Sequence, residues 1–383
     1  MAIDVLDFAL ELISKRSISG ETDEGAIELC AGTLKKMGFK NTTENFSGDG
    51  SYNVLNLYSE YGSGGKNLCF AGHTDVVPPG DERSWSVPPF SPKVVNGVLI
   101  GRGAVDMKGS IAAWISAVSE FLEANKNFNK GKLSLLITGD EEADSVNGTV
   151  KMLKSITAKG VKIDSCIVGE PTNPERLGEM MKIGRRGSIS FTITVQGVQG
   201  HVAYPKKANN PTTILVRILS ELTTHKLDSG NEFFEPSNLE VTSIDVNNPT
   251  ANLIPEKASA RLNIRFNNEH TGEKLAALVR TICAKHSDKF EIETRKGACE
   301  SFLSEPGNLA YVVEGAAGNI LGIFPAKSTT GGTSDARFIK DYAEVVEFGL
   351  INQTAHKVDE QVALTDLTAL KNIYRKVIEN YFS

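Results

Sequence analysis

The sequence predicts a mixed α/β fold, in which helices flank a mostly parallel sheet and a smaller α+β domain is inserted into the larger one. In the first half, short apolar runs that suit strands buried on both faces are separated by a helical pattern. Near residue 185 the pattern changes to strict alternation of apolar and polar residues, which is typical of a sheet with one face in water. The length of 383 residues allows two or three domains of roughly 150 residues each, and this change favours two.

The first domain is expected to contain a helix between two pairs of strands. Ile111, Ile115, Val118 and Leu122 recur at helical spacing and predict that helix. An earlier helix is expected to end at Gly38. The apolar runs that define the strands lie at 54–58, 68–71, 133–138 and 166–168. Strand, helix and strand in this order imply a largely parallel sheet.

The inserted domain is predicted from two strand–helix–strand units. One strand alternates over 188–195, and a helix follows from Pro211, a residue that favours the first helical turn. A second alternating strand covers 260–266 and is followed by a helix over 272–285 and a strand over 290–292. The expected boundaries are 1–184 with 297–383 for the first domain and 185–296 for the inserted one, with a closing helix from Asp366.

Composition excludes several classes of protein. Charged residues make up 23% and hydrophobic residues 40% of the chain, which excludes a disordered chain, a collagen and a coiled coil. The net charge of −6 offers no basic surface for nucleic acid or an anionic membrane. Five widely spaced cysteines without a CxxC pair argue against a disulfide scaffold and a thiolate zinc site. Since no basic leader and no apolar run of about 18 residues is found, a cytoplasmic protein is expected.

Acidic and imidazole side chains gather at the ends of the predicted strands or just before the predicted helix. They are His73 with Asp75, Asp106, the acidic run 140–142, and Glu170. Each has an ordinary explanation when taken alone: a capped strand end, a helix cap or a loop carboxylate. Together they lie where open α/β sheets place their sites, at the carboxyl ends of strands. Such ligands suit zinc or a similar divalent ion, and this number of carboxylates favours two ions that share a bridging ligand.

Four motifs carry a resemblance to a known family. FAGHTDVVP, GRGAVDMKGS, TGDEEA and IVGEPT resemble the metal-binding motifs of the di-zinc aminoacylase/carboxypeptidase-like metallopeptidase family and occur in that family's order. The resemblance covers essentially the whole chain and implies a zinc-exopeptidase-like catalytic domain. It also implies two divalent ions per subunit, expected to be Zn²⁺, with Co²⁺ or Mn²⁺ as alternatives.

The same resemblance implies the roles of five metal ligands. Asp106 would bridge the two ions, His73 and Glu170 would complete the coordination of one ion, and Glu142 and His356 that of the other.

The implied catalytic residues are three. Glu141 would be the general base, and Asp75 would orient His73. His201 would reach the active site of a second copy of the chain and, together with Asn252, help to hold the oxyanion. The expected partner is therefore a second subunit, bound through an inserted domain that serves dimerisation and acts as a lid.

Three later motifs concern the substrate. The resemblance is narrowed by the motifs GRRGS, GGTSDARF and NQTAHKVDE. They resemble those of family members that remove an N-succinyl group from a diamino diacid used in lysine and cell-wall precursor synthesis. Arginine forks suit carboxylates, so a small polycarboxylate substrate is expected. The implied substrate-binding residues are Arg185, Ser188, Asn252, Arg265, Gly332, Thr333 and Asn352.

Three alternatives remain at this stage. The nearest is an N-acetylornithine deacetylase or a general aminoacylase, which shares the reaction class. A non-catalytic metal- or peptide-binding relative is the second, although such a protein should have lost a ligand or the base. A structural or nucleic-acid-binding protein is the third, and no charged stripe or aromatic platform supports it.

Overall fold

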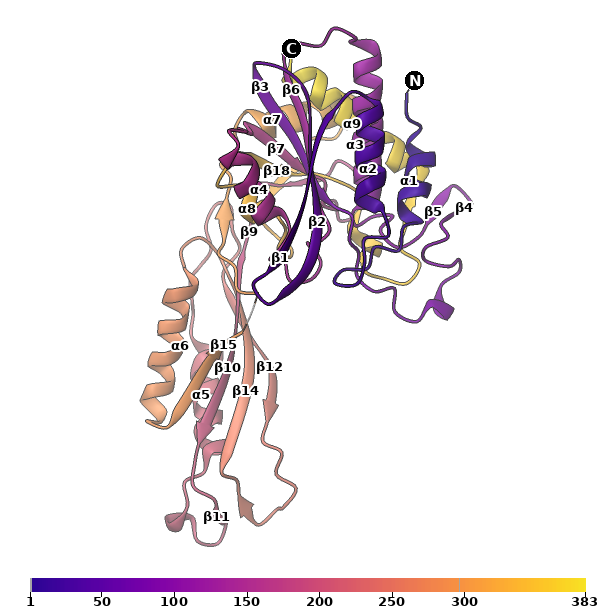
Figure 1. Cartoon of the computed structure of the whole chain (residues 1–383). Helices are drawn as coiled ribbons and strands as arrows, with labels where there is room; N and C mark the ends of the chain where they lie inside the picture. Colours follow the sequence, from indigo (N-terminus) through magenta and orange to yellow (C-terminus); the bar gives the residue numbers. More distant parts are fainter. Residues whose placement is uncertain (1, 296) are drawn as a thin grey trace. The chain divides into compact units, whose positions relative to one another are not determined.

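The chain forms two compact units, shown in Figure 1. The computed structural model describes residues 2–295 and 297–383. The first unit comprises the chain up to Ile183, Ser304–Ser328 and Ser334–Ser383, and the second comprises Gly184–Leu303 and Thr329–Thr333. Residues 297–303 and Thr329–Thr333 thus belong to the second unit, whereas the sequence pattern assigned them to the first domain.

The first unit is built on an eight-stranded mixed sheet. Its strand order is β1-β2-β6-β3-β7-β18-β8-β17. These strands are β1 (Lys40–Gly48), β2 (Ser51–Gly62), β3 (Lys66–His73), β6 (Gly131–Thr138), β7 (Ser165–Val168), β8 (Met180–Lys182), β17 (Ala326–Ser328) and β18 (Glu344–Glu347). The central pairs β6–β3, β3–β7 and β7–β18 are parallel, as is β8–β17, while β1–β2, β2–β6 and β18–β8 are antiparallel. The predicted fold class is confirmed.

The apolar runs identified in the sequence lie inside β2, β3, β6 and β7. Seven of the eight residues of β3 are buried, as are all four residues of β7. Burial on both faces explains why these strands read as continuous apolar runs rather than as alternating ones.

Helices flank this sheet. They are α1 (Val5–Ile13), α2 (Ala26–Lys36), α3 (Lys108–Ala124), α4 (Thr149–Ala158), α7 (Asn308–Leu321), α8 (Ala336–Ile339) and α9 (Leu364–Tyr381). Helix α3 packs against α1 and α9, and α7 also packs against α9. An aromatic cluster joins strand and helices, since the Phe70 ring stacks on Trp114 at 4.9 Å and both meet the edge of Tyr374. The Tyr374 hydroxyl donates to the Phe348 carbonyl at 2.6 Å, so the buried ring keeps its polar atom satisfied.

The first unit also contains a separate three-stranded sheet. It has the order β19-β5-β4 and consists of β4 (Lys93–Val95), β5 (Val98–Ile100) and β19 (Gln361–Ala363). Its antiparallel pairing of Gln361 with Ile100 joins segments about 260 positions apart in the chain.

The second unit is an antiparallel sheet with two helices packed on it. The sheet order is β12-β14-β10-β15, with the small pairs β11–β13 and β9–β16 at its ends. Its elements are β9 (Gly184–Arg185), β10 (Gly187–Gln196), β11 (Gly200–His201), α5 (Pro211–Thr224), β12 (Asn238–Asp245), β13 (Leu253–Ile254), β14 (Lys257–Phe266), α6 (Gly272–His286), β15 (Phe290–Thr294) and β16 (Phe302–Leu303). The alternating residues Ile189, Phe191, Ile193 and Val195 are buried in one core with residues of α5 and α6, so the predicted period-two pattern corresponds to a one-sided sheet.

The described residues also form three short 3-10 helices: η1 (Glu82–Ser84), η2 (Pro205–Lys207) and η3 (Asn352–Thr354). Among the described residues, no helix combines the length and the apolar character that crossing a bilayer requires.

Candidate metal centre

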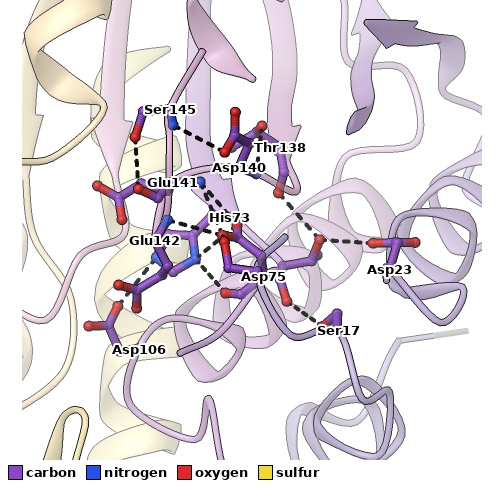
Figure 2. A network of polar contacts seen from close by, with 12 residues as sticks. Ser17, Asp23, His73, Asp75, Asp106, Thr138, Asp140, Glu141, Glu142 and Ser145 are labelled. Carbon is purple, nitrogen blue, oxygen red and sulfur yellow. Dashed lines mark hydrogen bonds and ion pairs between the residues drawn. The ribbon is translucent and has the colours of Figure 1, made fainter. Parts of the chain in front are cut away.

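The carboxyl ends of three parallel strands bring the candidate residues together. In the register of the sheet, His73 at the end of β3 lies opposite Thr138 at the end of β6, and Ala71 lies opposite Val168 at the end of β7. The acidic turn after β6 therefore lies beside His73 (Figure 2), and so does Glu170 after β7, whose Oε1 atom is 3.7 Å from His73 Nε2. The parallel arrangement inferred from the sequence is what places these groups at one edge.

One set of possible ligands consists of His73, Asp106 and Glu170. The His73 Nε2 atom lies 3.3 Å from Asp106 Oδ1 and 3.7 Å from Glu170 Oε1. These three atoms are buried, and none has a hydrogen-bond partner among the described residues. Buried polar atoms are normally satisfied, so three unpaired donor atoms within ligand reach of one another fit a cation.

A second set shares Asp106 with the first. The His356 Nε2 atom lies 2.9 Å from Glu142 Oε1 and 3.2 Å from Asp106 Oδ2. The ligand atoms of Asp106, Glu142 and His356 lie within 4.8 Å of one another, as do those of the first set. Asp106 thus presents one oxygen to each set, which is the geometry that a bridging carboxylate requires.

In a third combination, the ligand atoms of His73, Glu141 and Glu142 also lie within 4.8 Å of one another. The unpaired buried atoms favour the first set over it, because they belong to His73, Asp106 and Glu170.

Asp106 does not cap the helix that follows it. Helix α3 begins at Lys108, its N-cap is Met107, and no side chain caps its first turn. The ordinary explanation for an aspartate before a helix therefore does not apply, and the Asp106 carboxylate is directed at the two histidines instead.

Asp75 supports the site through both its backbone and its side chain. The Nδ1 atom of His73 lies 2.8 Å from the Asp75 carbonyl oxygen and 3.6 Å from its carboxylate, so the backbone makes the orienting hydrogen bond. The Asp75 carboxylate instead accepts hydrogen bonds from the Glu141 N–H at 3.2 Å and the Glu142 N–H at 3.0 Å, and from the Ser19 hydroxyl at 2.6 Å. One residue thus fixes the ring of His73 and the turn that carries two other candidates.

Asp140 points away from its two acidic neighbours. Its carboxylate accepts hydrogen bonds from the N–H groups of Ser145, Val146 and Asn147 at 2.9 to 3.1 Å, and from the Tyr52 hydroxyl. Of the three consecutive carboxylates, which should repel one another, that of Asp140 is therefore directed away from those of Glu141 and Glu142 (Figure 2).

The pKa values of four groups in this cluster are raised where several carboxylates lie close together. Burial raises the pKa values of Glu141 and Glu170 well above the usual range, and neighbouring carboxylates raise them further. Burial alone would lower the pKa of His73, but the nearby carboxylates of Asp106, Asp75 and Glu170 raise it. The pKa of His356 rises to about 10 because Asp106 and Glu142 accept hydrogen bonds from its ring. Metal binding at such groups must displace protons.

Several residues of this region were not assigned a role from the sequence. Ser19 and Tyr52 join the hydrogen-bond network from distant segments, and their sequence surroundings give no signal. Asp335 lies in the GGTSDARF motif, is buried, and has a pKa raised to about 6 by that burial. Glu360 closes the NQTAHKVDE motif and is fully buried, so these two motifs did contain a signal.

The other predicted residues belong to η3 of the first unit and to the second unit. Asn352 begins η3 in the first unit and donates its N–H to the Asn173 carbonyl at 2.8 Å. In the second unit, Ser188 pairs with Arg265 across β10 and β14. Arg185 approaches the glycine turn before Gly332 and Thr333, since a Cβ atom on Gly331 would lie 2.7 Å from its Nη1 atom. His201 and Asn252 meet through the β11–β13 pair, where the Val202 N–H donates to the Asn252 carbonyl.

The comparisons with known proteins identify the class. The profile of Peptidase family M20/M25/M40 matches residues 69–380, and the chain belongs to this family. A succinyl-diaminopimelate desuccinylase from Pelagibacter ubique is 47% identical, with 98% of each chain covered. A succinyl-diaminopimelate desuccinylase from Rhodospirillum centenum is 48% identical, covering 100% of this chain and 98% of the relative.

Solved structures of the family share the fold. An M20 family metallo-carboxypeptidase from Sulfolobus solfataricus superimposes with a TM-score of 0.78 at 20% identity, covering 99% of each chain. A dinuclear metal-binding M20 peptidase from Bacillus subtilis gives a TM-score of 0.68 at 14% identity, covering 99% of this chain and 97% of the other.

The Asp75→Asn substitution tests the support of this centre. It removes one of the acceptor oxygens that hold the 141–142 turn, so we expect the affinity for Zn²⁺ to fall about 10- to 100-fold. Competition with a chromogenic chelator measures this affinity. Asp81→Asn is the matched control, because the Asp81 carboxylate is exposed and bonds only within its own turn, to Arg83. Equal Zn²⁺ affinities for the two variants would contradict the supporting role.

Proposed function

We propose that this chain is a metal-dependent amide hydrolase that cleaves N-succinyl-LL-2,6-diaminopimelate to succinate and LL-2,6-diaminopimelate. The reaction would serve bacterial lysine and diaminopimelate synthesis in the cytoplasm. The observation that carries the proposal is the similarity to desuccinylases, which are 47–48% identical to this chain over nearly the whole length of both proteins. In addition, every candidate ligand and the candidate base are present in this chain.

The metal centre of this proposal contains two divalent ions, with zinc as the expected metal. His73 and Glu170 would hold one ion, Glu142 and His356 would hold the other, and Asp106 would contribute to both. The support is the pairing of the two ligand sets and the three unpaired buried atoms. When bound, such ions lower the pKa of water and polarise the scissile carbonyl.

Glu141 is the proposed general base and acid. Its backbone is held in the same way as that of Glu142, because the Asp75 carboxylate accepts hydrogen bonds from the N–H groups of both residues. Its raised pKa brings the carboxyl group closer to the range in which a side chain both takes and returns a proton. Glu141 would take a proton from the attacking water and give it to the departing amine, so that the amide becomes succinate and a free amino group.

Arginine residues of the second unit are proposed to bind the substrate carboxylates. Arg185 is buried, and its guanidinium lies against the turn that leads to Gly332 and Thr333. Arg265 lies opposite Ser188, and the Asn263 side chain donates to the Ser188 hydroxyl at 3.2 Å. Planar guanidinium groups and fixed hydroxyls suit carboxylate recognition, and Asn352 would add a further hydrogen bond.

We also propose a homodimer formed through the second unit, in which His201 and Asn252 act on the active site of the partner. Within one unit, Arg185 precedes β10 and His201 follows it, and the ten residues of this strand span about 30 Å. These two residues of one chain therefore lie at opposite ends of a strand. Exposed apolar side chains lie close to His201 in the sequence, since Val198, Val202 and Tyr204 are 46%, 46% and 61% exposed, and exposed apolar groups of this kind mark contact surfaces.

The Glu141→Gln substitution separates the base from the ligands. The amide keeps the shape of the side chain but cannot accept a proton, so kcat should fall by about 100-fold or more. Two zinc ions per subunit should remain, as measured by elemental analysis of the purified variant. Glu142→Gln is the control that should lose zinc. Loss of zinc from the Glu141 variant would contradict the division of roles.

The substrate is tested by side-by-side hydrolysis. We expect kcat/KM for N-succinyl-LL-2,6-diaminopimelate to exceed that for N-acetylornithine by about 100-fold or more. An acetyl group lacks the carboxylate of a succinyl group, so a buried arginine such as Arg185 would have no acyl carboxylate to bind when the acetyl compound occupies the site. Zinc content is measured on the same sample. Faster turnover of the acetyl compound would replace the proposal with the deacetylase alternative.

The action of His201 across subunits is tested with a heterodimer. His201→Ala and Glu141→Gln chains with different tags are co-expressed and purified through both tags. Each variant alone should be nearly inactive, but the heterodimer contains one intact site and should recover about half of the wild-type activity per dimer. A heterodimer without recovered activity would show that His201 does not serve the partner's site.

A further inference from the structure

Glu360 is a fully buried carboxylate to which the proposed mechanism gives no role. It lies four residues after His356, and its side chain is 0% exposed. Both of its oxygens are used. Oε1 accepts the N–H groups of Val105 at 2.8 Å and Asp106 at 2.9 Å, and Oε2 accepts the Gly103 N–H at 2.9 Å and the Arg102 Nη1 at 2.7 Å.

All four donors belong to one loop, the loop that ends in Asp106. The backbone of Glu360 adds a fifth contact, because its carbonyl accepts the Gly101 N–H at 2.9 Å. The next residue, Gln361, then pairs with Ile100 in the β19–β5 ladder. The loop 101–106 is thus wrapped around one side chain, and that side chain is carried by the segment that also carries His356.

The turn between His356 and Glu360 is itself closed. The Thr354 hydroxyl donates to the Gln361 carbonyl at 3.0 Å and accepts the Gln361 N–H at 3.1 Å. The Asp359 carboxylate holds the N–H of Ser86 at 2.7 Å. His356 and Glu360 therefore lie in one turn that is closed by hydrogen bonds. The Glu360 side chain joins this turn to the backbone of Asp106.

We propose that Glu360 is a positioning residue that holds Asp106 in register with His356, so that the two can bind one metal ion together. The inference rests on the metal centre proposed above. An ion pair with Arg102 alone would not need this arrangement. Arg102 bonds to Oε2, whereas Oε1 accepts the N–H groups of Val105 and Asp106. Hydrogen bonds to an ionised acceptor are short and strong, which suits a group that must hold a ligand loop.

Three variants separate positioning from charge compensation. Glu360→Gln keeps the volume but turns an N–H₂ group toward backbone donors. Glu360→Asp keeps the charge but is one methylene too short to reach the loop. Arg102→Met with Glu360→Gln removes both charges, so that no buried cation is left unpaired. Glu344→Gln is the matched control, since the Glu344 carboxylate also accepts a backbone N–H, that of Leu309 at 2.8 Å, but lies at the amino end of β18.

The readout is Zn²⁺ stoichiometry and affinity by chelator competition, together with the absorption spectrum of the Co²⁺ form and the Tm. For all three Glu360 variants we expect the affinity for at least one of the two ions to fall about 10- to 100-fold, with an altered Co²⁺ spectrum. Glu344→Gln should bind both ions like the wild type. Should Glu360→Gln not fold, Glu360→Asp and the double variant decide the question.

Two results would overturn the inference. Wild-type Zn²⁺ affinity in Glu360→Asp would show that reach to the loop is unimportant. Wild-type affinity in the double variant would show that Glu360 only compensates the charge of Arg102. Failure of the proposed function is distinguishable, because a wild-type chain that binds no Zn²⁺ would reject the metal centre and the inference together, before any variant is compared.

Discussion

The structure of the first unit depends on one electrostatic constraint, the crowding of buried carboxylates at the carboxyl edge of its sheet. Asp106, Glu170 and Glu142 lie within a few ångströms of two imidazole rings, and burial makes each unpaired charge costly. Protons shared with His73 and His356 relieve part of this cost, as their raised pKa values indicate. Divalent cations would relieve it more completely, because they offer charge and fixed ligand directions together.

Around the candidate ligands lies a second group of acids, whose carboxylates accept hydrogen bonds from backbone N–H groups. Asp75 holds the N–H groups of the 141–142 turn, Asp140 those of the 145–147 turn, and Glu360 those of the loop before Asp106. Each acid adds negative charge near the ligands, yet each is solvated by several N–H dipoles. These hydrogen bonds fix the backbone around the candidate ligands.

The parts of the fold that could be predicted are those with a local signal. The runs in β3, β6 and β7 and the period of α3 follow from burial, and the rule that parallel strands end at a common edge then predicts that His73, Glu142 and Glu170 meet. Strand β1 was not predicted, because its sequence KNTTENFSG is polar and its structure comes from pairing with β2. The roles of Ser19, Tyr52 and Glu360 depend on contacts across 56 to 258 positions of the chain, which no local pattern encodes. His356 and Asn252 were expected only through the family resemblance.

The division of the chain into two units has a consequence for how metal binding relates to turnover. All five candidate ligands, Glu141 and the acids that support them belong to the first unit. Arg185, Arg265 and His201 belong to the second. Ion binding at the proposed centre would therefore depend on the internal geometry of one unit, whereas turnover as proposed would also use residues of the other unit and, for His201, of a second chain. On this proposal, a substitution in the second unit that abolishes turnover should leave the ions in place, because none of the five candidate ligands belongs to that unit. In such a protein, loss of activity alone does not show which unit a substitution has damaged. A separate measurement of ion binding does show this.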